Sequence, residues 1–149
     1  MSLSVFLGID VGTTAIKLGV IEENQLLYTN DHPIETSGNE IVKYQDANQI
    51  LAVLQEGLMT IPLELRRRIT KLGISTAMHS LMPEDDSGQI FIWSDLQAAG
   101  VIEQFKQVKK ATAKHFYQLT GTPIHAMSPF AKLLYFQQAE KYPAELHWS

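Results

Sequence analysis

A short segment near the N-terminus carries residue types that can bind a phosphate group. Gly12, Thr13 and Thr14 have the composition of a turn between two strands, and such a turn can direct several backbone N–H groups at one anion. Gly12 lets the chain approach phosphate oxygens closely and take a positive φ, and the two threonines add hydroxyl donors. Asp10 can hold a magnesium ion through water molecules, and Lys17 supplies a positive charge. The turn is therefore a candidate phosphate site.

The spacing of this segment differs from that of two common nucleotide-binding loops. No Gly-Lys-Ser/Thr follows the turn, so it is not a Walker A loop. A strand rather than a helix is expected after it, which excludes the dinucleotide fingerprint. A hairpin that uses Gly12 and the two threonines only to turn the chain remains the alternative.

A second group of polar residues follows a predicted strand at residues 72–77. Met78 can lie against the carbon skeleton of a polyol, and His79 and Ser80 can form hydrogen bonds with hydroxyl or carboxylate oxygens. The ends of strands are where α/β sheets usually bind ligands. A histidine that is merely packed or exposed is the alternative for His79.

The strands that must position these residues follow from apolar patterning. Short apolar or alternating runs predict strands at residues 5–9, 16–20, 26–28, 72–77 and 90–93. The first three are joined by short turns, so they must be antiparallel neighbours. The run at 72–77 suits a buried strand, and the region from about 29 to 45 is expected to be a loop.

The first predicted helix begins after Asp46, which can cap it, with Gln49 three residues later. Residues at helical spacing give it one apolar face, formed by Ile50, Leu51, Val53, Leu54 and Leu58. The order of elements is a mixed α/β pattern that opens with hairpins.

Three further helices are predicted in the C-terminal part. Asp95 can cap one over about 96–107. A second ends before Gly121, which can take the left-handed conformation of a C-terminal cap. In the third, Ser128 and Pro129 form a start signal for a helix that runs to about Lys141.

Composition narrows the class of protein. The chain has 149 residues, with 12 Lys and Arg against 16 Asp and Glu, for a formal charge of −4, and 45% hydrophobic residues. This predicts a soluble globular chain, long enough for one core and short for two. The acidic balance argues against nucleic acid as a partner.

The absence of certain features excludes further classes. There is no cysteine, which removes disulfides, thiol nucleophiles and cysteine-based zinc sites. No apolar run approaches the roughly 20 residues that span a bilayer, so no membrane partner is expected. The first ten residues lack a basic region and contain Asp10, so they do not form a signal peptide. We expect a cytoplasmic protein.

Several segments resemble those of one family, in the same order. Residues 8–14 resemble the first phosphate motif of the actin-like ATPase superfamily, and Met78-His79 resembles the Met-His motif of the FGGY carbohydrate kinases, which contacts the sugar. Trp93-Ser94-Asp95 resembles their Trp-x-Asp element, and residues 120–129 resemble the segment that completes the sugar pocket. Taken together, the sequences of the Met78-His79 segment and of residues 120–129 look most like those of the gluconate kinases in this family. The Arg that commonly follows the Asp by two positions is here Gln97, which weakens an Arg-based contact.

The resemblance implies a fold and a set of site residues. The fold would be α/β, ribonuclease H-like (actin-like ATPase), with a mixed sheet that opens with antiparallel hairpins and is flanked by helices. The implied cofactors are ATP and Mg²⁺, with Asp10 as the metal residue and a phosphate site formed by Asp10, Gly12, Thr13, Thr14 and Lys17. The implied sugar contacts are Met78, His79, Ser80, Trp93, Asp95, His125 and Met127. A cationic His125 would suit a gluconate carboxylate, whereas simple core packing is the alternative for Trp93.

The implied activity of the full-length enzyme is ATP-dependent phosphorylation of a sugar or sugar acid. The resemblance to gluconate kinases points to gluconate as the substrate and 6-phosphogluconate as the product. We expect residues 1–149 to be a partial FGGY N-terminal domain, without the C-terminal ATP-binding domain and without a catalytic base. The expected partner is the small sugar or sugar-acid substrate. Whether the chain forms a homodimer is left undecided by the sequence. The alternative function is that of a non-catalytic remnant of a sugar kinase that binds a polyol or a protein.

Overall fold

The computed structural model describes residues 4–108 and 110–149, which form two compact units. The first unit contains the chain up to Thr36 and Asp46–Ala77, and the second contains Ser37–Gln45 and Met78–Ser149. The length predicts one core, but each unit has a core of its own. The start of the segment predicted not to be a signal peptide, residues 1–3, lies outside the described residues.

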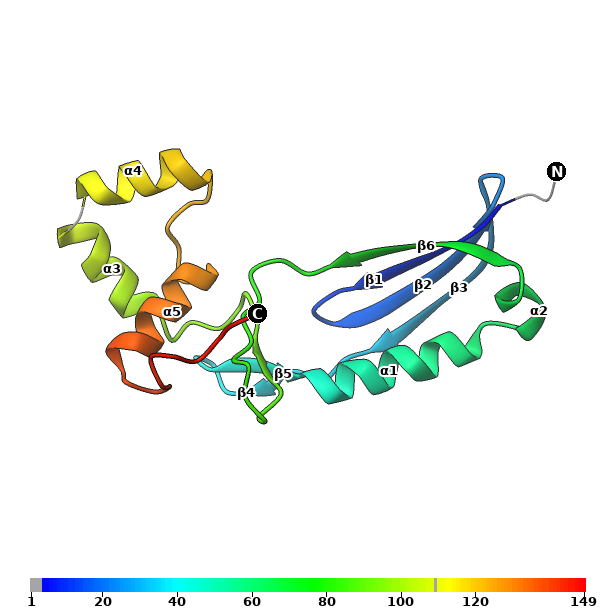
Figure 1. The fold of residues 1–149 in the computed structure, drawn as a ribbon, viewed down its shortest axis with the longest axis horizontal. Coiled ribbons are helices and arrows are strands. Elements are labelled where there is room, and N and C mark those ends of the chain that lie inside the picture. The colour runs from blue at the N-terminus through cyan, green and yellow to red at the C-terminus, as the bar shows by residue number, and fades with distance from the viewer. Residues whose placement is uncertain (1–3, 109) are drawn as a thin grey trace. The chain divides into compact units, whose positions relative to one another are not determined.

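A four-stranded mixed sheet forms the centre of the first unit (Figure 1). Its strand order is β3-β2-β1-β6, with β1 antiparallel to β2, β2 antiparallel to β3, and β1 parallel to β6. The strands are β1 (Val5–Val11), β2 (Ala15–Glu22), β3 (Gln25–Pro33) and β6 (Ile69–Thr76). The predicted antiparallel order of the first three strands is confirmed. The parallel β6 is possible because a helical crossover separates it from the hairpins.

Helix α1 (Ala47–Thr60) covers one face of this sheet, where it packs on β2 and β3. Its predicted cap is confirmed, since the Asp46 side chain accepts a hydrogen bond from the Asn48 N–H at 2.8 Å. The sheet contributes buried residues at alternating positions, as a half-buried strand requires: Val5, Leu7, Ile9, Ile16, Leu18 and Val20. The predicted apolar face of α1 is correct except at Leu51, which is exposed. The short helix α2 (Leu63–Arg66), which we did not predict, follows.

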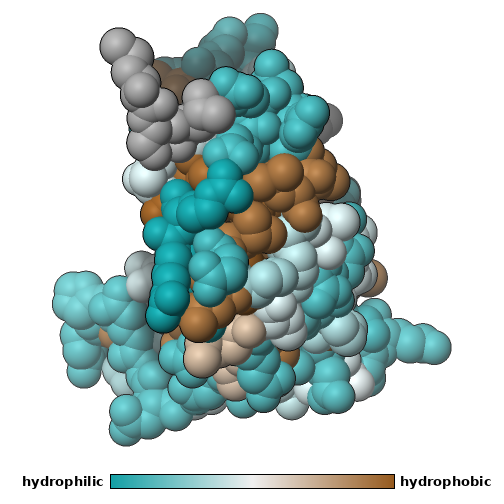
Figure 2. All heavy atoms as spheres, turned by 90° about the vertical axis from the view of Figure 1, so that its right-hand side faces the viewer, coloured by the Kyte–Doolittle hydropathy of each residue, from teal (hydrophilic) through white to brown (hydrophobic). Residues whose placement is uncertain are grey.

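The prediction that the 72–77 strand is buried is wrong. Leu72 and Ile74 of β6 are 56% and 62% exposed. Two features explain this exposure: β6 is an edge strand with β1 as its one neighbour, and α1 packs on β2 and β3 instead. Apolar residues gather on the surface in Figure 2, and exposed apolar side chains of the four strands include Phe6, Ile21 and Leu26.

The second unit combines a small sheet with three helices. The sheet has the order β4-β5-β7. Its strands are β4 (Ser37–Gly38), β5 (Lys43–Asp46) and β7 (Gln89–Phe91), and the helices are α3 (Ala99–Val108), α4 (Lys110–Thr120) and α5 (Pro129–Gln138). Its two apolar clusters centre on Phe91 with Phe136 and on Ile102 with Ala131. The prediction of a loop over about 29–45 is wrong in part, because this region contains the end of β3, all of β4 and most of β5. A strand as short as β4 leaves no periodic signal.

Two predicted helix boundaries in this unit are wrong. Helix α3 begins at Ala99 rather than near 96, and the Ile102 N–H already donates to the Ala98 carbonyl, so Asp95 does not cap it. Helix α5 ends at Gln138 rather than near Lys141. The start of α5 is confirmed, since Ser128 caps it with Pro129 in its first turn. The left-handed Gly121, with φ of 68°, is also confirmed.

Across the described parts of the chain, every helix is too short or too polar to span a bilayer.

Candidate functional site

The predicted phosphate turn joins β1 to β2 in the first unit. The Gly12 N–H donates to the Ala15 carbonyl at 3.0 Å, which closes the turn around Thr13 and Thr14. On its two sides, Asp10 and Lys17 stand directly opposite each other in the antiparallel register. Opposite residues in a strand pair share one face of the sheet. The carboxylate and the ammonium group therefore project from the same face, beside the turn.

The role predicted for Gly12 is partly wrong. Positive φ angles among the described glycines occur at Gly38, Gly88 and Gly121, and not at Gly12. The constraint at Gly12 is space instead, because a Cβ atom there would lie 3.1 Å from the Ala15 carbonyl oxygen. The glycine thus permits a tight hairpin, which both the phosphate-site and the plain-turn interpretations require.

A hollow of about 520 Å³ lies on the open face of the first unit's sheet. Gly8 forms its floor together with Gly19 and Gly73, which are its register partners on either side. Polar side chains around this floor come from Asp10, Lys17, Thr29 and Ser75. An acid, a base and two hydroxyls beside bare backbone can accept a polar, anionic group.

The described residues include no cluster of three or more acidic or histidine side chains able to hold a metal alone. Magnesium, however, is usually held by one or two carboxylates together with substrate phosphates and water. Asp10 is exposed beside the turn, so it fits that second mode.

The Met78-His79-Ser80 segment lies at the start of the second unit's continuous part. Met78 is 74% exposed, whereas His79 and Ser80 are half-buried. His79 has a φ of 66°, in the left-handed region where histidine is enriched but still uncommon. Such outliers persist only where the surroundings hold them, and they cluster at ligand sites.

The Trp93 segment runs beside the His79 segment. Leu81 and Phe91 exchange backbone hydrogen bonds of 2.9 and 2.8 Å, which pair the two segments just beyond their candidate residues. Trp93 is 49% exposed, so the alternative of simple core packing is wrong. An indole with this much exposed surface can stack on the carbon skeleton of a sugar.

Asp95 is fully buried, and both of its carboxylate oxygens accept hydrogen bonds. Oδ2 accepts from the Lys43 N–H at 3.0 Å and from the Gln97 side-chain amide at 2.9 Å, and Oδ1 accepts from the Gln97 N–H at 3.3 Å. Gln97, at the position where the family commonly has Arg, therefore contacts this carboxylate. The sugar contact of Asp95 stays a prediction, and it would require this network to open.

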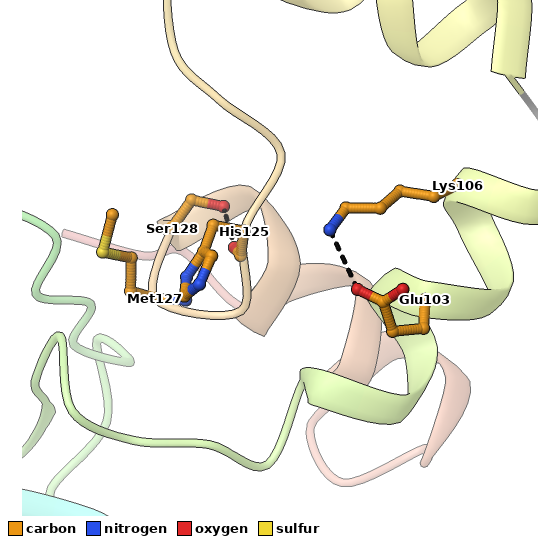
Figure 3. A network of polar contacts seen from close by, with 5 residues as sticks. All are labelled: Glu103, Lys106, His125, Met127 and Ser128. Atoms are coloured by element: carbon orange, nitrogen blue, oxygen red, sulfur yellow. Dashed lines mark hydrogen bonds and ion pairs between the residues drawn. The ribbon is translucent and has the colours of Figure 1, made fainter.

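His125 and Met127 lie in the turn before α5, on the opposite side of the view from the Lys106–Glu103 pair of α3 (Figure 3). The Met127 N–H donates to His125 Nδ1 at 3.2 Å, and the Ser128 hydroxyl donates to the His125 carbonyl at 2.8 Å. An Nδ1 atom that accepts a hydrogen bond carries no proton. Because Nδ1 is engaged in this way, Nε2 is the ring nitrogen available to a ligand.

Lys132 of α5, to which the sequence analysis gave no role, connects two of these segments. Its side chain is fully buried, and Nζ donates to the Met127 carbonyl at 2.6 Å and to the His79 carbonyl at 3.4 Å. Burial lowers the pKa of Lys132 to about 8, and the nearby Asp95 charge partly opposes this effect. The sequence offered one signal for this role, which is a lysine placed among apolar residues of a capped helix. Such a lysine is drawn towards the core, and a buried lysine requires hydrogen-bond or charge partners.

The candidate residues thus fall into two groups. The second unit contains all of the predicted sugar residues, and its contacts bring the His79 segment beside both the Trp93 and the Met127 segments. The phosphate-turn residues belong to the first unit.

Comparison with known proteins places the chain among sugar kinases. A gluconokinase from Bacillus subtilis (strain 168) is 26% identical over 145 residues, which cover 93% of this chain and 28% of that protein. The crystal structure of gluconate kinase from Lactobacillus acidophilus aligns with a TM-score of 0.79 at 25% identity, over 94% of this chain and 29% of that one. Plasmodium falciparum glycerol kinase, solved with ADP, aligns with a TM-score of 0.77 at 18% identity, over 91% and 29%.

These similarities confirm the predicted fold class, an α/β fold of the actin-like ATPase type with a mixed sheet and flanking helices. The chain spans about 28% of the length of its Bacillus subtilis relative. The family described as "FGGY family of carbohydrate kinases, N-terminal domain" matches residues 5–145. The chain therefore belongs to the FGGY family of carbohydrate kinases, in the part that forms their N-terminal domain.

Proposed function

We propose that this chain forms the sugar-binding part, with the first phosphate motif, of an ATP-dependent kinase that phosphorylates gluconate. The observation that carries the proposal is the convergence of the predicted sugar segments, since one lysine Nζ contacts the carbonyls of both His79 and Met127. The gluconokinase relative supports gluconate among sugars. The proposed setting is the cytoplasm.

In this proposal the second unit binds and orients the sugar. The exposed Trp93 and Met78 side chains offer apolar surface to its carbon skeleton. His79 and Ser80 offer hydrogen bonds to its hydroxyl groups, and His125 donates from Nε2 to the carboxylate. Fixing an acceptor hydroxyl in this way removes much of the entropic barrier to phosphoryl transfer.

In the first unit, the turn around Gly12 and the Lys17 ammonium group would hold phosphate oxygens of ATP, and Asp10 would hold Mg²⁺. The ion, when bound, neutralises charge on the transferring phosphoryl group. Thr13 and Thr14 would add hydroxyl donors to the same anion. This assignment rests on the Asp10–Lys17 register and on the polar hollow beside it.

The 149 residues supply no catalytic base in this proposal. A base must reach the accepting hydroxyl, directly or through one water. Asp95 is fully buried with both oxygens engaged, and Asp10 is assigned to the metal. Proton removal would therefore be the task of a carboxylate outside residues 1–149.

A chimera tests the proposal: this chain replaces the matching part of the Bacillus subtilis gluconokinase. We expect gluconate to stimulate ADP release more strongly than xylulose or glycerol, and the His79→Ala chimera to lose that stimulation. A properly folded chimera that binds gluconate without releasing ADP would instead support the alternative of a non-catalytic polyol-binding remnant. Gluconate binding is the common requirement of both functions.

A further inference from the structure

We infer that Lys132 is a positioning residue of the sugar site, whose ammonium group fixes the peptide groups that carry His79 and Met127. The inference rests on the proposed function and adds a residue to its site. No candidate contact was assigned to Lys132 by the sequence pattern.

The geometry makes Lys132 the connection between two segments that are remote in sequence. Nζ lies 3.4 Å from the His79 carbonyl oxygen and 2.6 Å from the Met127 carbonyl oxygen. A lysine ammonium group has three donors and no acceptor, so it can hold two carbonyls at once. Loss of the group would leave two carbonyl oxygens without this partner.

At the His79 end, the hydrogen bond from Lys132 supports an unusual backbone conformation. With φ of 66°, His79 is in the left-handed conformation that residues other than glycine adopt uncommonly, histidine included. The Lys132 hydrogen bond is made to the carbonyl of that same residue. It therefore favours the left-handed peptide orientation, which in turn sets where the His79 and Ser80 side chains point.

The Met127 end is set by a rigid element. Lys132 is on the first turns of α5, whose N-cap is Ser128. The same short stretch contains the hydrogen bond from the Met127 N–H to His125 Nδ1. The ammonium group of Lys132 thus fixes the position of the His125–Met127 turn, and of α5, relative to the His79 segment.

The burial of Lys132 indicates that its two hydrogen bonds belong to the interior of the second unit and not to its surface. The Lys132 side chain has no exposed surface, although lysine is almost never fully buried without partners. The negative charge of Asp95 stabilises the ammonium form of Lys132. Asp95 in turn accepts hydrogen bonds from the Lys43 and Gln97 backbone N–H groups. The buried pair therefore sits among all three predicted sugar segments.

The test compares gluconate affinity of the 149-residue chain and its Lys132→Met variant by calorimetry. Lys141→Met is the matched control: Lys141 lies in the same unit and contacts the rings of Phe91, Phe136 and Tyr142, so its loss perturbs packing without touching the site. We expect at least tenfold weaker binding for Lys132→Met and less than twofold for Lys141→Met. Equal effects of the two changes would overturn the inference.

A second measurement separates positioning from stability. In amide ¹H–¹⁵N spectra, Lys132→Met should shift the signals of Ser80 and Ser128, whose N–H groups share peptide units with the two carbonyls. Unchanged signals at both residues would overturn the inference. If Lys132→Met does not melt cooperatively, Lys132→Gln, which keeps one neutral donor group, takes its place.

The two measurements also distinguish failures. A folded wild-type chain that binds no sugar would contradict the proposed function, and the role of Lys132 would then be judged from the Ser80 and Ser128 signals alone. Wild-type binding that survives Lys132→Met undiminished would contradict only the role of Lys132.

Discussion

At the scale of single residues, the buried Lys132 makes a distinctive prediction about pH. Its pKa is lowered from 10.5 to about 8 by burial. Between these values the unfolded chain binds a proton that the folded chain releases, so the free energy of unfolding rises with pH. We expect chemical denaturation of the wild type to show this rise from pH 8 to 9.5, and Lys132→Met to lack it.

The pH range of this measurement ends at 9.5 because Tyr142 changes the pH dependence of stability at higher pH. Burial, with a smaller contribution from Asp85, raises the pKa of Tyr142 above 10.0. The folded chain then holds a proton that the unfolded chain releases, so stability falls with pH above that value. Parallel curves for the wild type and Lys132→Met between pH 8 and 9.5 would show that Lys132 is not desolvated.

His79 allows its side chain and its backbone to be separated by substitution. His79→Ala removes the predicted sugar contact but keeps a Cβ at a φ of 66°, so alanine carries left-handed strain of the kind that histidine already carries. His79→Asn removes the imidazole but tolerates that conformation. We expect both variants to bind gluconate more weakly, and the asparagine variant to be more stable than the alanine variant, as urea denaturation would show. Unchanged affinity in both would remove His79 from the site.

At the scale of elements, two helix caps offer a matched comparison. Ser128 caps α5 by accepting from the Ala131 N–H, and Asp46 caps α1 by accepting from the Asn48 N–H. Either change to alanine should cost about 1 kcal/mol of stability. Only Ser128→Ala should also weaken gluconate binding, because α5 positions Lys132 and the His125–Met127 turn. Equal affinity in the two variants would separate α5 from the site.

Two helical glycines should respond in opposite directions to alanine. A Cβ at Gly57 of α1 would lie 2.8 Å from His32 Cδ2 and 3.1 Å from Leu18 Cδ1, whereas one at Gly100 of α3 meets nothing within 4 Å. We expect Gly100→Ala to stabilise the chain by about 0.5–1 kcal/mol and Gly57→Ala to destabilise it. Thermal melts measure both, and a stabilising Gly57→Ala would mean that α1 packs less closely on β2 and β3.

The elements also show where sequence reasoning succeeds. The hairpin strands, the Asp46 and Ser128 caps and the Gly121 terminus were predicted because each has a local signal. The exposure of β6 was not, because an apolar strand looks the same whether or not another layer covers it. The start of α3 was misjudged because Asp95, a good cap by residue type, is used instead by the Lys43 and Gln97 backbones.

At the scale of the whole molecule, the candidate site divides between predictable and unpredictable parts. The phosphate turn and the sugar segments could be found because they resemble short family motifs. The role of Lys132 could not be found, because it depends on a contact with His79, which is 53 residues away, and such tertiary contacts leave no periodic signal. Gln97 likewise seemed a loss at an Arg position, yet it contacts Asp95 directly.

The central claim is that these 149 residues already form a sugar site, and calorimetric titration of the folded chain with gluconate tests it most directly. Xylulose, glycerol and magnesium ATP serve as comparison ligands. The account predicts saturable binding that is selective for gluconate, and a melt stabilised by about 2.7 kcal/mol at 100 times the dissociation constant. A cooperatively folded chain that binds none of the three sugar ligands would contradict it.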